Sequence, residues 1–460
     1  MLCSLILPLL MQGVTLDVAP ADLQLYPRDA QGFGTLVVEG DWSPETAQES
    51  LRFEVVDGAG NLVATEVKQE LLGAILAPQP FQMKVRVAAG LINYEAFLIR
   101  RHAGVDEILD SWSGIAVGDV LFVHGQSNAV AGDAWGQGVA NAMDQSPWVR
   151  TYGSTSTLQA EVLADQSWHI ADGELQGTSG CIGSWGLDIA RKIVDEEGIP
   201  VAVLNGAVGG TVVAQHQRNE ANHEDLTTIY GRLLWRARKA GVKHAVRAMF
   251  WYQGESEGSN TLGWRDGFAT MFADWEQDFP NIEHFWIVQV RRGCGAPSLA
   301  LRDLQRRLCH RRDDFHGATA NGLRGHDGCH FRYQGYEDLG AQLVPQIAHW
   351  LYGHPLIPDS TAPDPVSATW VDTNQDALYL DFRNVSGSFS IPDDSWNTFV
   401  LDDGTKVVGA ITIGFRLRLE LEGPSTATQL AFRGTHGGSQ PWIRNERGLA
   451  IMSFQGITIQ

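Results

Sequence analysis

The chain has 460 residues, of which 44% are hydrophobic and 19% charged, as is usual for soluble globular proteins of about three domains. Its formal net charge is −20, from 54 acidic and 34 basic residues. This charge argues against a nucleic-acid partner, because binding to phosphate backbones needs clustered Lys and Arg. It suits neutral partners such as sugars, although charge alone identifies no substrate.

Residues 1–11 form an apolar run with the length of a signal-peptide core, but without a basic leader or a clear cleavage site. We expect residues 1–13 to be a signal or leader segment, with a hydrophobic first strand as the alternative. We accordingly expect a secreted or periplasmic protein. No later stretch reaches the ~20 apolar residues that a membrane span needs.

Short segments of β character follow in residues 14–116, separated by turn signals such as residues 57–61. This pattern predicts an N-terminal β-sandwich-like domain. The strands expected there are residues 35–39, 51–56 and 81–87.

The pattern changes near Asp119, where apolar runs alternate with segments of helical periodicity. This alternation predicts an α/β domain with a parallel sheet over residues 117–356. The strands expected are 120–124, 201–205, 245–252 and 285–290, and the helices include Leu187, Ala190 and Val194, then Leu226 to Ala237, then 336–351.

Four prolines lie within residues 353–365, which indicates a linker, placed at 357–368. Alternating apolar residues in segments 377–382 and 415–421 predict a C-terminal β domain over 369–460.

The five cysteines match no zinc-site spacing, so we expect no metal, and one or two disulfides remain open. They are Cys3, Cys181, Cys294, Cys309 and Cys329.

Gly125-Gln126-Ser127-Asn128 directly follows an apolar strand. Catalytic groups gather at the carboxyl ends of strands in open α/β sheets, so Ser127 is placed like a nucleophile. The alternative is that Ser127 or Asn128 merely caps the next helix.

Three further turns follow later strands or precede the last helix. Residues 205–211 (Asn-Gly-Ala-Val-Gly-Gly-Thr) offer backbone N–H groups that could hold an oxyanion, although the turn could also be purely structural. Their glycines do not follow the spacing of a dinucleotide-binding turn. Gln253 and Glu255 supply an amide and a carboxylate. Asp327 stands three residues before His330, close enough to orient it, although such a pair is common and His326 competes with His330.

Together, G-Q-S-N, G-G-T, W-Y-Q-G-E-S and D-G-C-H, in this order, resemble the SGNH-hydrolase superfamily, and within it the sialate O-acetylesterase-like or carbohydrate acetylesterase branch. The resemblance covers residues 119–356. It implies a flavodoxin-like domain and a serine esterase that removes acetyl groups from acetylated sialic acid, xylan or a related glycan, without a cofactor.

The same resemblance implies the role of each site residue. Ser127 would be the nucleophile, His330 the general base and Asp327 the carboxylate that orients it. The backbone N–H groups of Ser127 and Gly210 and the amide of Gln253 would hold the oxyanion. Gly209, which directly precedes the preferred oxyanion donor Gly210, would have a supporting role. Asn128 and Glu255 would have supporting roles as well.

Ser256 is a competing nucleophile, because Gly254-Glu-Ser-Glu-Gly258 spells the G-x-S-x-G elbow of α/β-hydrolases. We prefer Ser127, because Glu255 and Glu257 beside Ser256 would oppose a developing negative charge.

Three tryptophans, Trp135, Trp168 and Trp185, lie in segments that could line the mouth of the site, where indoles stack on sugars. Two other functions stay open: a non-catalytic carbohydrate-binding protein, and a lipase or thioesterase on the same scaffold.

Overall fold

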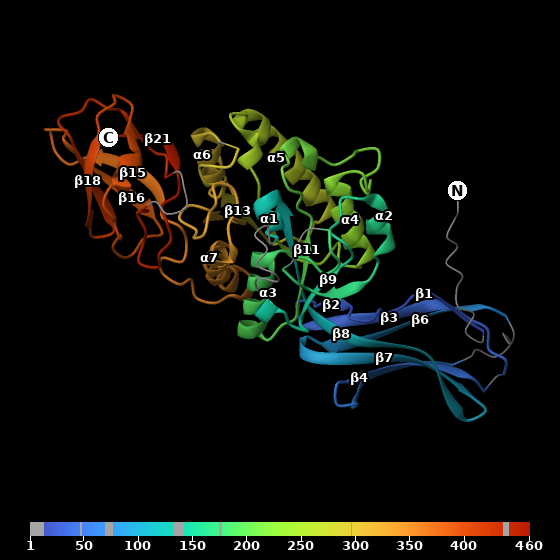
Figure 1. Ribbon diagram of the computed structural model, residues 1–460. Helices are drawn as coiled ribbons and strands as arrows, with labels where there is room; N and C mark the ends of the chain where they lie inside the picture. The colour runs from blue at the N-terminus through green and yellow to red at the C-terminus, as the bar shows by residue number, and fades with distance from the viewer. Residues whose placement is uncertain are drawn as a thin grey trace.

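The computed structural model shows a mixed α/β protein in which an N-terminal β unit, a central α/β unit and a C-terminal β unit lie in a row (Figure 1). The structure describes residues 13–46, 48–69, 77–132, 142–173, 177–295, 297–435 and 441–460. The expected leader therefore lies outside the described residues, apart from Gly13. No helix in these ranges is long and apolar enough to span a membrane.

The N-terminal unit packs two β layers around an apolar core that includes Trp42, Phe53 and Trp112. Its strands alternate buried and exposed residues because successive side chains of a strand point to opposite faces. The strands are β1 (Val14–Val18), β2 (Leu25–Pro27), β3 (Phe33–Trp42), β4 (Ser50–Asp57), β5 (Leu62–Gln69), β6 (Gln79–Ala88), β7 (Gly90–His102) and the first half of β8 (Val105–Gly125).

β8 belongs to two units at once. Its first half pairs antiparallel with β7, and its second half pairs parallel with β11 (Val201–Asn205) and β12 (Val246–Tyr252). The domain boundary expected at residue 116 thus falls inside one continuous strand. The buried carboxylate of Asp119 reinforces this junction, since it binds Arg28 of the N-terminal unit at 2.8 Å and Arg247 of the central unit at 3.1 Å.

The central sheet runs in the order β10-β9-β11-β8-β12-β13-β14. From β11 onward this is the 2-1-3-4-5 order of flavodoxin-like sheets, in which ligands bind beyond the carboxyl ends of the strands at the point where the order reverses. That point is the end of β8. The remaining strands are β9 (Val149–Tyr152), β10 (Trp168–Ile170), β13 (His284–Gln289) and β14 (Phe315–Thr319).

Helices cover both faces of this sheet because β8 is apolar on both sides. Leu121 and Val123 pack toward α3 (Ser184–Glu197) and α7 (Tyr333–Tyr352), whereas Val120 and Phe122 pack toward the opposite layer. The opposite layer consists of α4 (Ile229–Lys239), α5 (Thr261–Asp278) and α6 (Leu299–Leu308). A short helix, α2 (Gln159–Ala164), lies between β9 and β10.

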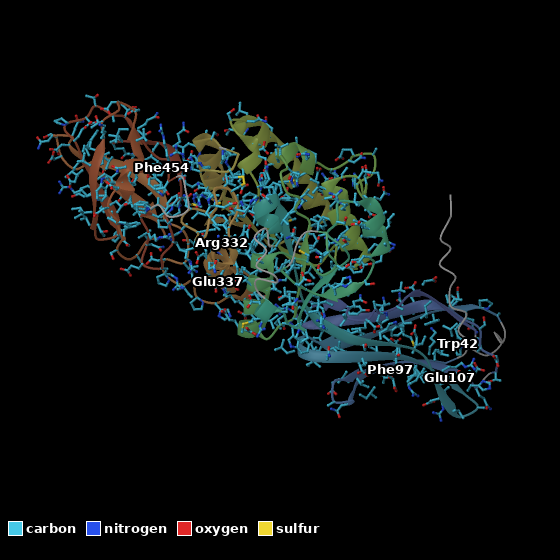
Figure 2. All side chains as sticks on the ribbon, in the orientation of Figure 1. Trp42, Phe97, Glu107, Arg332, Glu337 and Phe454 are labelled. Carbon is cyan, nitrogen blue, oxygen red and sulfur yellow. A yellow bond between two sulfur atoms is a disulfide. The ribbon has the colours of Figure 1, made fainter. Side chains whose placement is uncertain are left out.

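The C-terminal unit has a four-stranded and a three-stranded sheet around its own core, in which Phe454 is fully buried (Figure 2). Its first strand begins at Asp364, inside the segment expected to be a linker. The strands are β15 (Asp364–Trp370), β16 (Ala377–Arg383), β17 (Phe399–Leu401), β18 (Val407–Ile413), β19 (Arg416–Leu421), β20 (Gln429–Phe432) and β21 (Phe454–Thr458).

Candidate active site

The turn at the end of β8 places Ser127 as the first residue of α1 (Ser127–Val130). Gly125 has φ +137°, and a Cβ there would lie 2.1 Å from the carbonyl oxygen of Tyr252, so only glycine fits. The residue that caps α1 is Gln126, whose side chain makes no capping hydrogen bond. Neither Ser127 nor Asn128 is therefore the helix cap, and Ser127 is half-buried at the end of the sheet.

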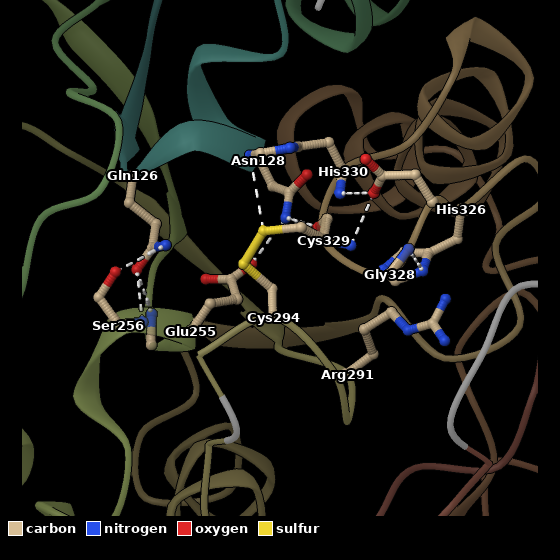
Figure 3. Close-up of a disulfide and its surroundings, with 12 residues drawn as sticks. Gln126, Asn128, Glu255, Ser256, Arg291, Cys294, His326, Gly328, Cys329 and His330 are labelled. Atoms are coloured by element: carbon tan, nitrogen blue, oxygen red, sulfur yellow. Dashed lines mark hydrogen bonds between the residues drawn. A yellow bond between two sulfur atoms is a disulfide. The ribbon is translucent and has the colours of Figure 1, made fainter.

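Asn128 connects this turn to two other segments (Figure 3). Its Nδ2 donates to Glu255 Oε1 at 2.8 Å and to the carbonyl oxygen of Cys329 at 3.1 Å. Its Oδ1 accepts a hydrogen bond from the Tyr336 hydroxyl at 3.1 Å. The side chain is 1% exposed, so these bonds form away from water and hold the Cys329–His330 backbone beside the nucleophile turn.

The turn after β11 lies against the same place. The N–H of Val208 donates to the Gly125 carbonyl at 3.0 Å. A Cβ on Gly209 would lie 3.7 Å from the Ser127 Cβ, whereas a Cβ on Gly210 would meet nothing within 4 Å. Gly210 has φ +72°, which glycine adopts without strain. Gly209 therefore borders Ser127, and the space where a Gly210 Cβ would lie is open.

A row of three buried polar side chains, Thr211, His216 and His124, packs against this turn. The Thr211 hydroxyl donates to the Val208 carbonyl at 2.7 Å and lies 2.8 Å from His216 Nε2. His216 Nδ1 in turn lies 3.3 Å from Nε2 of His124 on β8. Burial lowers the pKa of His124 to about 3 and the pKa of His216 well below its usual value, so both rings are neutral.

Gln253 is fully buried, and its amide is engaged within the protein. Nε2 donates to Glu257 Oε1 at 2.8 Å and to the Thr211 carbonyl at 3.1 Å, while Oε1 accepts from the indole of Trp264 at 2.6 Å. In this arrangement the amide hydrogens point to internal acceptors rather than to the space beside Ser127. Its role as an oxyanion donor stays a prediction.

Glu255 carries an isolated buried carboxyl group. Oε1 accepts from Asn128, and Oε2 is buried without a hydrogen-bond partner among the described residues. Burial raises the pKa of Glu255 to about 7, although the Asn128 hydrogen bond acts in the opposite direction. The group is therefore partly protonated near neutral pH.

Ser256, the competing nucleophile, lies in the 3-10 helix η3 (Glu255–Glu257) rather than in a strand–turn–helix elbow. Its hydroxyl accepts from Gln126 Nε2 at 3.3 Å, and its backbone N–H donates to Gln126 Oε1 at 3.3 Å (Figure 3). These bonds give Ser256 a structural contact with the Gly-Gln-Ser-Asn turn.

Asp327 and His330 lie on the loop before α7, and a disulfide between Cys294 and Cys329 ties this loop to the segment after β13 (Figure 3). Asp327 Oδ1 accepts from the backbone N–H groups of Cys329 at 2.7 Å and His330 at 2.6 Å. Burial alone would raise the pKa of Asp327, but these two donors together with the nearby His330 and His326 rings outweigh it and leave the pKa below its usual value.

The His330 ring faces the disulfide, with Nε2 3.8 Å from Cys329 Sγ. Within the described ranges, no hydrogen bond joins this ring to Ser127 or to the Asp327 carboxylate. The structure thus brings the Ser127 turn and the Asp327–His330 loop together through Asn128. His326 instead uses Nδ1 to accept from the Gly328 N–H at 2.8 Å, which is a contact within the loop.

The expectation that Trp168 and Trp185 line the mouth of the site is wrong, because both are buried in the core. The Trp185 indole donates to the Asn128 carbonyl at 2.9 Å and so supports α1 from inside the protein. Trp135 lies outside the described residues. Cys181 and Cys309 are buried and take part in no disulfide, and Cys3 is not described.

Two features of the site leave no pattern in the sequence: the central position of Asn128 and the contact between His124 and His216. Asn128 is visible there only as part of the Gly-Gln-Ser-Asn motif, and His216 belongs to none of the four motifs. Among the described residues, one group has the proximity that a metal ion needs, namely Glu45, Glu49 and His102 in the N-terminal unit.

Comparison with known proteins agrees with the fold. No curated protein sequence matches the chain. A carbohydrate acetylesterase from Xanthomonas citri has a similar structure, with 19% identity and a TM-score of 0.63 over 96% of this chain and 99% of that one. A protein from Arabidopsis thaliana matches with 16% identity and a TM-score of 0.39, over 51% of this chain and 98% of that one.

A family model described as "Carbohydrate esterase, sialic acid-specific acetylesterase" matches residues 117–349. These residues contain β8 from its junction onward, all four motifs and most of α7. The resemblance to the carbohydrate acetylesterase branch is thereby confirmed, and the chain belongs to this carbohydrate esterase family.

Proposed function

We propose that the protein is a serine esterase on the SGNH scaffold that removes O-acetyl groups from an acetylated glycan through an acetyl-serine intermediate. One observation carries this proposal. Asn128 Nδ2 binds the carbonyl of Cys329, so the residue after Ser127 holds the residue before His330. A serine at a strand end and a histidine on a neighbouring loop are the parts that acyl transfer needs.

In the proposed reaction the Ser127 hydroxyl attacks the acetyl carbonyl carbon while His330 removes its proton. His330 then gives this proton to the departing sugar oxygen, and water hydrolyses the acetyl-serine by the reverse roles. Asp327 would stabilise the protonated ring once a side-chain rotation brings its carboxylate to it. The reaction likewise requires the His330 ring to leave its contact with Cys329 Sγ and to reach the Ser127 hydroxyl.

The oxyanion is proposed to bind the N–H groups of Ser127 and Gly210, with Gly209 shaping the approach and Gln253 as a further donor. The open space where a Gly210 Cβ would lie is compatible with a ligand at this turn. Gln253 could act only if its amide exchanged Thr211 or Glu257 for the substrate. If it does, Gln253→Ala should lower kcat by roughly 10²–10³ with little change in KM, the usual effect of losing one such donor.

The central test compares Ser127→Ala with its matched control Ser256→Ala. We expect Ser127→Ala to abolish p-nitrophenyl acetate hydrolysis and acetate release from acetylated xylan. Ser256→Ala should retain activity, because it removes only a contact to Gln126. Near wild-type activity of pure Ser127→Ala would refute the assignment. Comparing acetylated xylan, acetylated sialic acid and longer acyl esters would then define the substrate.

A further inference from the structure

A cavity of about 330 Å³ lies where the central unit meets the C-terminal unit. This volume is at the lower end of the range of small-ligand pockets. Its wall is formed by the segment from α6 into β14, the last turns of α7, the segment from Leu356 to the start of β15, the end of β16, and Met452. The side chains important here are His310, His316, Trp350, Asp364, Arg383 and Asn384.

Trp350 offers an aromatic surface in this cavity. Trp350 is 40% exposed, which is more than any other tryptophan that the structure describes. One face stacks on His316, with ring centroids 4.5 Å apart and planes inclined by 23°. His349 and His284 also contact the indole, at centroid distances of 4.6 and 5.7 Å, so these rings fix it, and its exposed part is what remains accessible to a ligand. A rigid indole of this kind suits the apolar face of a sugar ring.

Apart from the exposed Asp313, whose negative charge would repel an anion, the charged residues of the cavity wall are already paired within the protein. Asp364 binds Arg306 at 2.6 Å, His310, and Arg383 at 3.4 Å. Arg312, also in the wall, pairs with Glu276 and Asp314. Burial lowers the pKa of His316 to about 3, so its ring is neutral. No side chain of this set is left to neutralise a charged ligand, which favours a neutral ligand over an anionic one.

Exposed polar side chains in the cavity wall could bond the hydroxyl groups of a sugar. Asn384 and Arg383 are exposed on the cavity wall, and Asn384 has φ +59° at the end of β16. Amide and guanidinium groups bond hydroxyls in fixed directions, and a stacking ring between such groups is the usual composition of a small-ligand pocket.

We propose that this cavity is a second, non-catalytic carbohydrate site in which Trp350 stacks on a neutral pyranose ring and Asn384 and Arg383 bond its hydroxyls. The proposal rests on the proposed function in one respect only, namely that the substrate is a glycan. From Tyr333 to Trp350 the helix α7 rises about 25 Å at the usual rise per residue. The ring bound here would thus belong to a distant part of the polymer rather than to the acetylated residue at Ser127.

The test measures binding of sugars that carry no ester. Xylohexaose, cellohexaose and mannohexaose, all free of acetyl groups, are titrated by calorimetry into the full-length wild type, Trp350→Ala, Asn384→Ala and Phe415→Ala. Phe415 is the matched control, because it is an aromatic residue 61% exposed and is absent from the cavity wall. p-Nitrophenyl acetate hydrolysis is measured on the same samples.

We expect at least one hexasaccharide to bind the wild type, at least tenfold weaker binding by Trp350→Ala, severalfold weaker binding by Asn384→Ala and no change in Phe415→Ala. Small-ester hydrolysis should stay within twofold in all four proteins. The proposal is overturned if no hexasaccharide binds the wild type or if Trp350→Ala binds the hexasaccharides like the wild type. Since the probes contain no ester, an inactive Ser127 would refute the proposed function and leave this result unaffected.

Discussion

Asn128 Nδ2 and Glu255 Oε1 lie 2.8 Å apart and join two turns that are 127 residues apart in the chain. The same Nδ2 reaches the Cys329 carbonyl, so one buried amide connects the motif of the nucleophile, the third motif and the histidine loop (Figure 3). Figure 3 also shows that Glu255 lies beside the disulfide which closes this loop. The relative position of Ser127 and His330 therefore depends on Asn128.

Asn128→Asp should lower kcat strongly and destabilise the fold. The substitution replaces a donor by an acceptor that faces Glu255 Oε1 and the Cys329 carbonyl, and an unsatisfied buried polar group costs about 1–3 kcal/mol, more if charged. Esterase kinetics and urea unfolding measure the two effects. Asn374→Asp, in an exposed turn, is the control and should change neither. Unaltered kcat in Asn128→Asp would show that Asn128 does not position the loop.

The buried carboxyl group of Glu255 should make stability fall as pH rises. Its pKa is about 7 in the fold against 4.5 for the free group, so between these values the unfolded chain releases a proton that the folded chain keeps. The free energy of unfolding then decreases by about 3 kcal/mol across this interval and levels off above it.

Glu255→Gln cannot titrate and should remove this decrease. Urea unfolding between pH 5 and pH 8 should show the variant gaining stability relative to the wild type as pH rises. Exposed Glu196→Gln serves as the control and should run parallel to the wild type. A constant difference between Glu255→Gln and the wild type over this range would contradict the raised pKa.

His216→Ala should reduce kcat more than it changes KM. Removing the ring takes away the contacts of the Thr211 hydroxyl and of His124 Nε2 with His216, so the turn that carries Gly209 and Gly210 loses part of its support. We expect about a tenfold loss of kcat, which corresponds to about 1.4 kcal/mol in the barrier. Rescue by His216→Asn, which can still reach one of the two partners, would support a positioning role.

The matched control for this experiment is His316→Ala, because His316 also forms a buried histidine pair, 2.9 Å from His284. It lies at the other end of the sheet, by Trp350. It should lose comparable stability and keep its activity on p-nitrophenyl acetate. Equal loss of kcat in both variants would mean that the effect of His216→Ala is general destabilisation.

Removal of the Cys294–Cys329 disulfide should lower activity and stability together. The two cysteines are 35 residues apart, and closing a loop of this length stabilises a fold by roughly 3–4 kcal/mol in the chain-entropy model. Cys294→Ser/Cys329→Ser frees the backbone next to His330, so kcat should fall severalfold. The wild type treated with a reductant should behave like the double variant, and the double variant should not respond to the reductant. If the reductant lowered the activity of the double variant by the same factor, its effect on the wild type would come from a group other than this disulfide.

The sequence located nine of the 21 strands that the structure describes, and the order of the motifs. Alternation gave β4 and β6 nearly to their ends, and continuous apolar runs gave β11 and β12, because burial on one or two faces leaves different patterns. Other elements left no clear pattern. β7 and α5 were not expected, and Leu226 lies before α4 rather than in it.

By itself, then, the sequence determined the family, the α/β character of residues 117–349 and the placing of Ser127 at a strand end, since these depend on local periodicity and on short motifs. Only the tertiary structure decided which partners the side chains take. It continued β8 through the domain boundary, paired Cys294 with Cys329, turned the Gln253 amide inward and buried Trp168 and Trp185. Each of these depends on contacts between distant segments. Such contacts are set by how layers pack and which buried polar groups must be satisfied, and no local pattern records them.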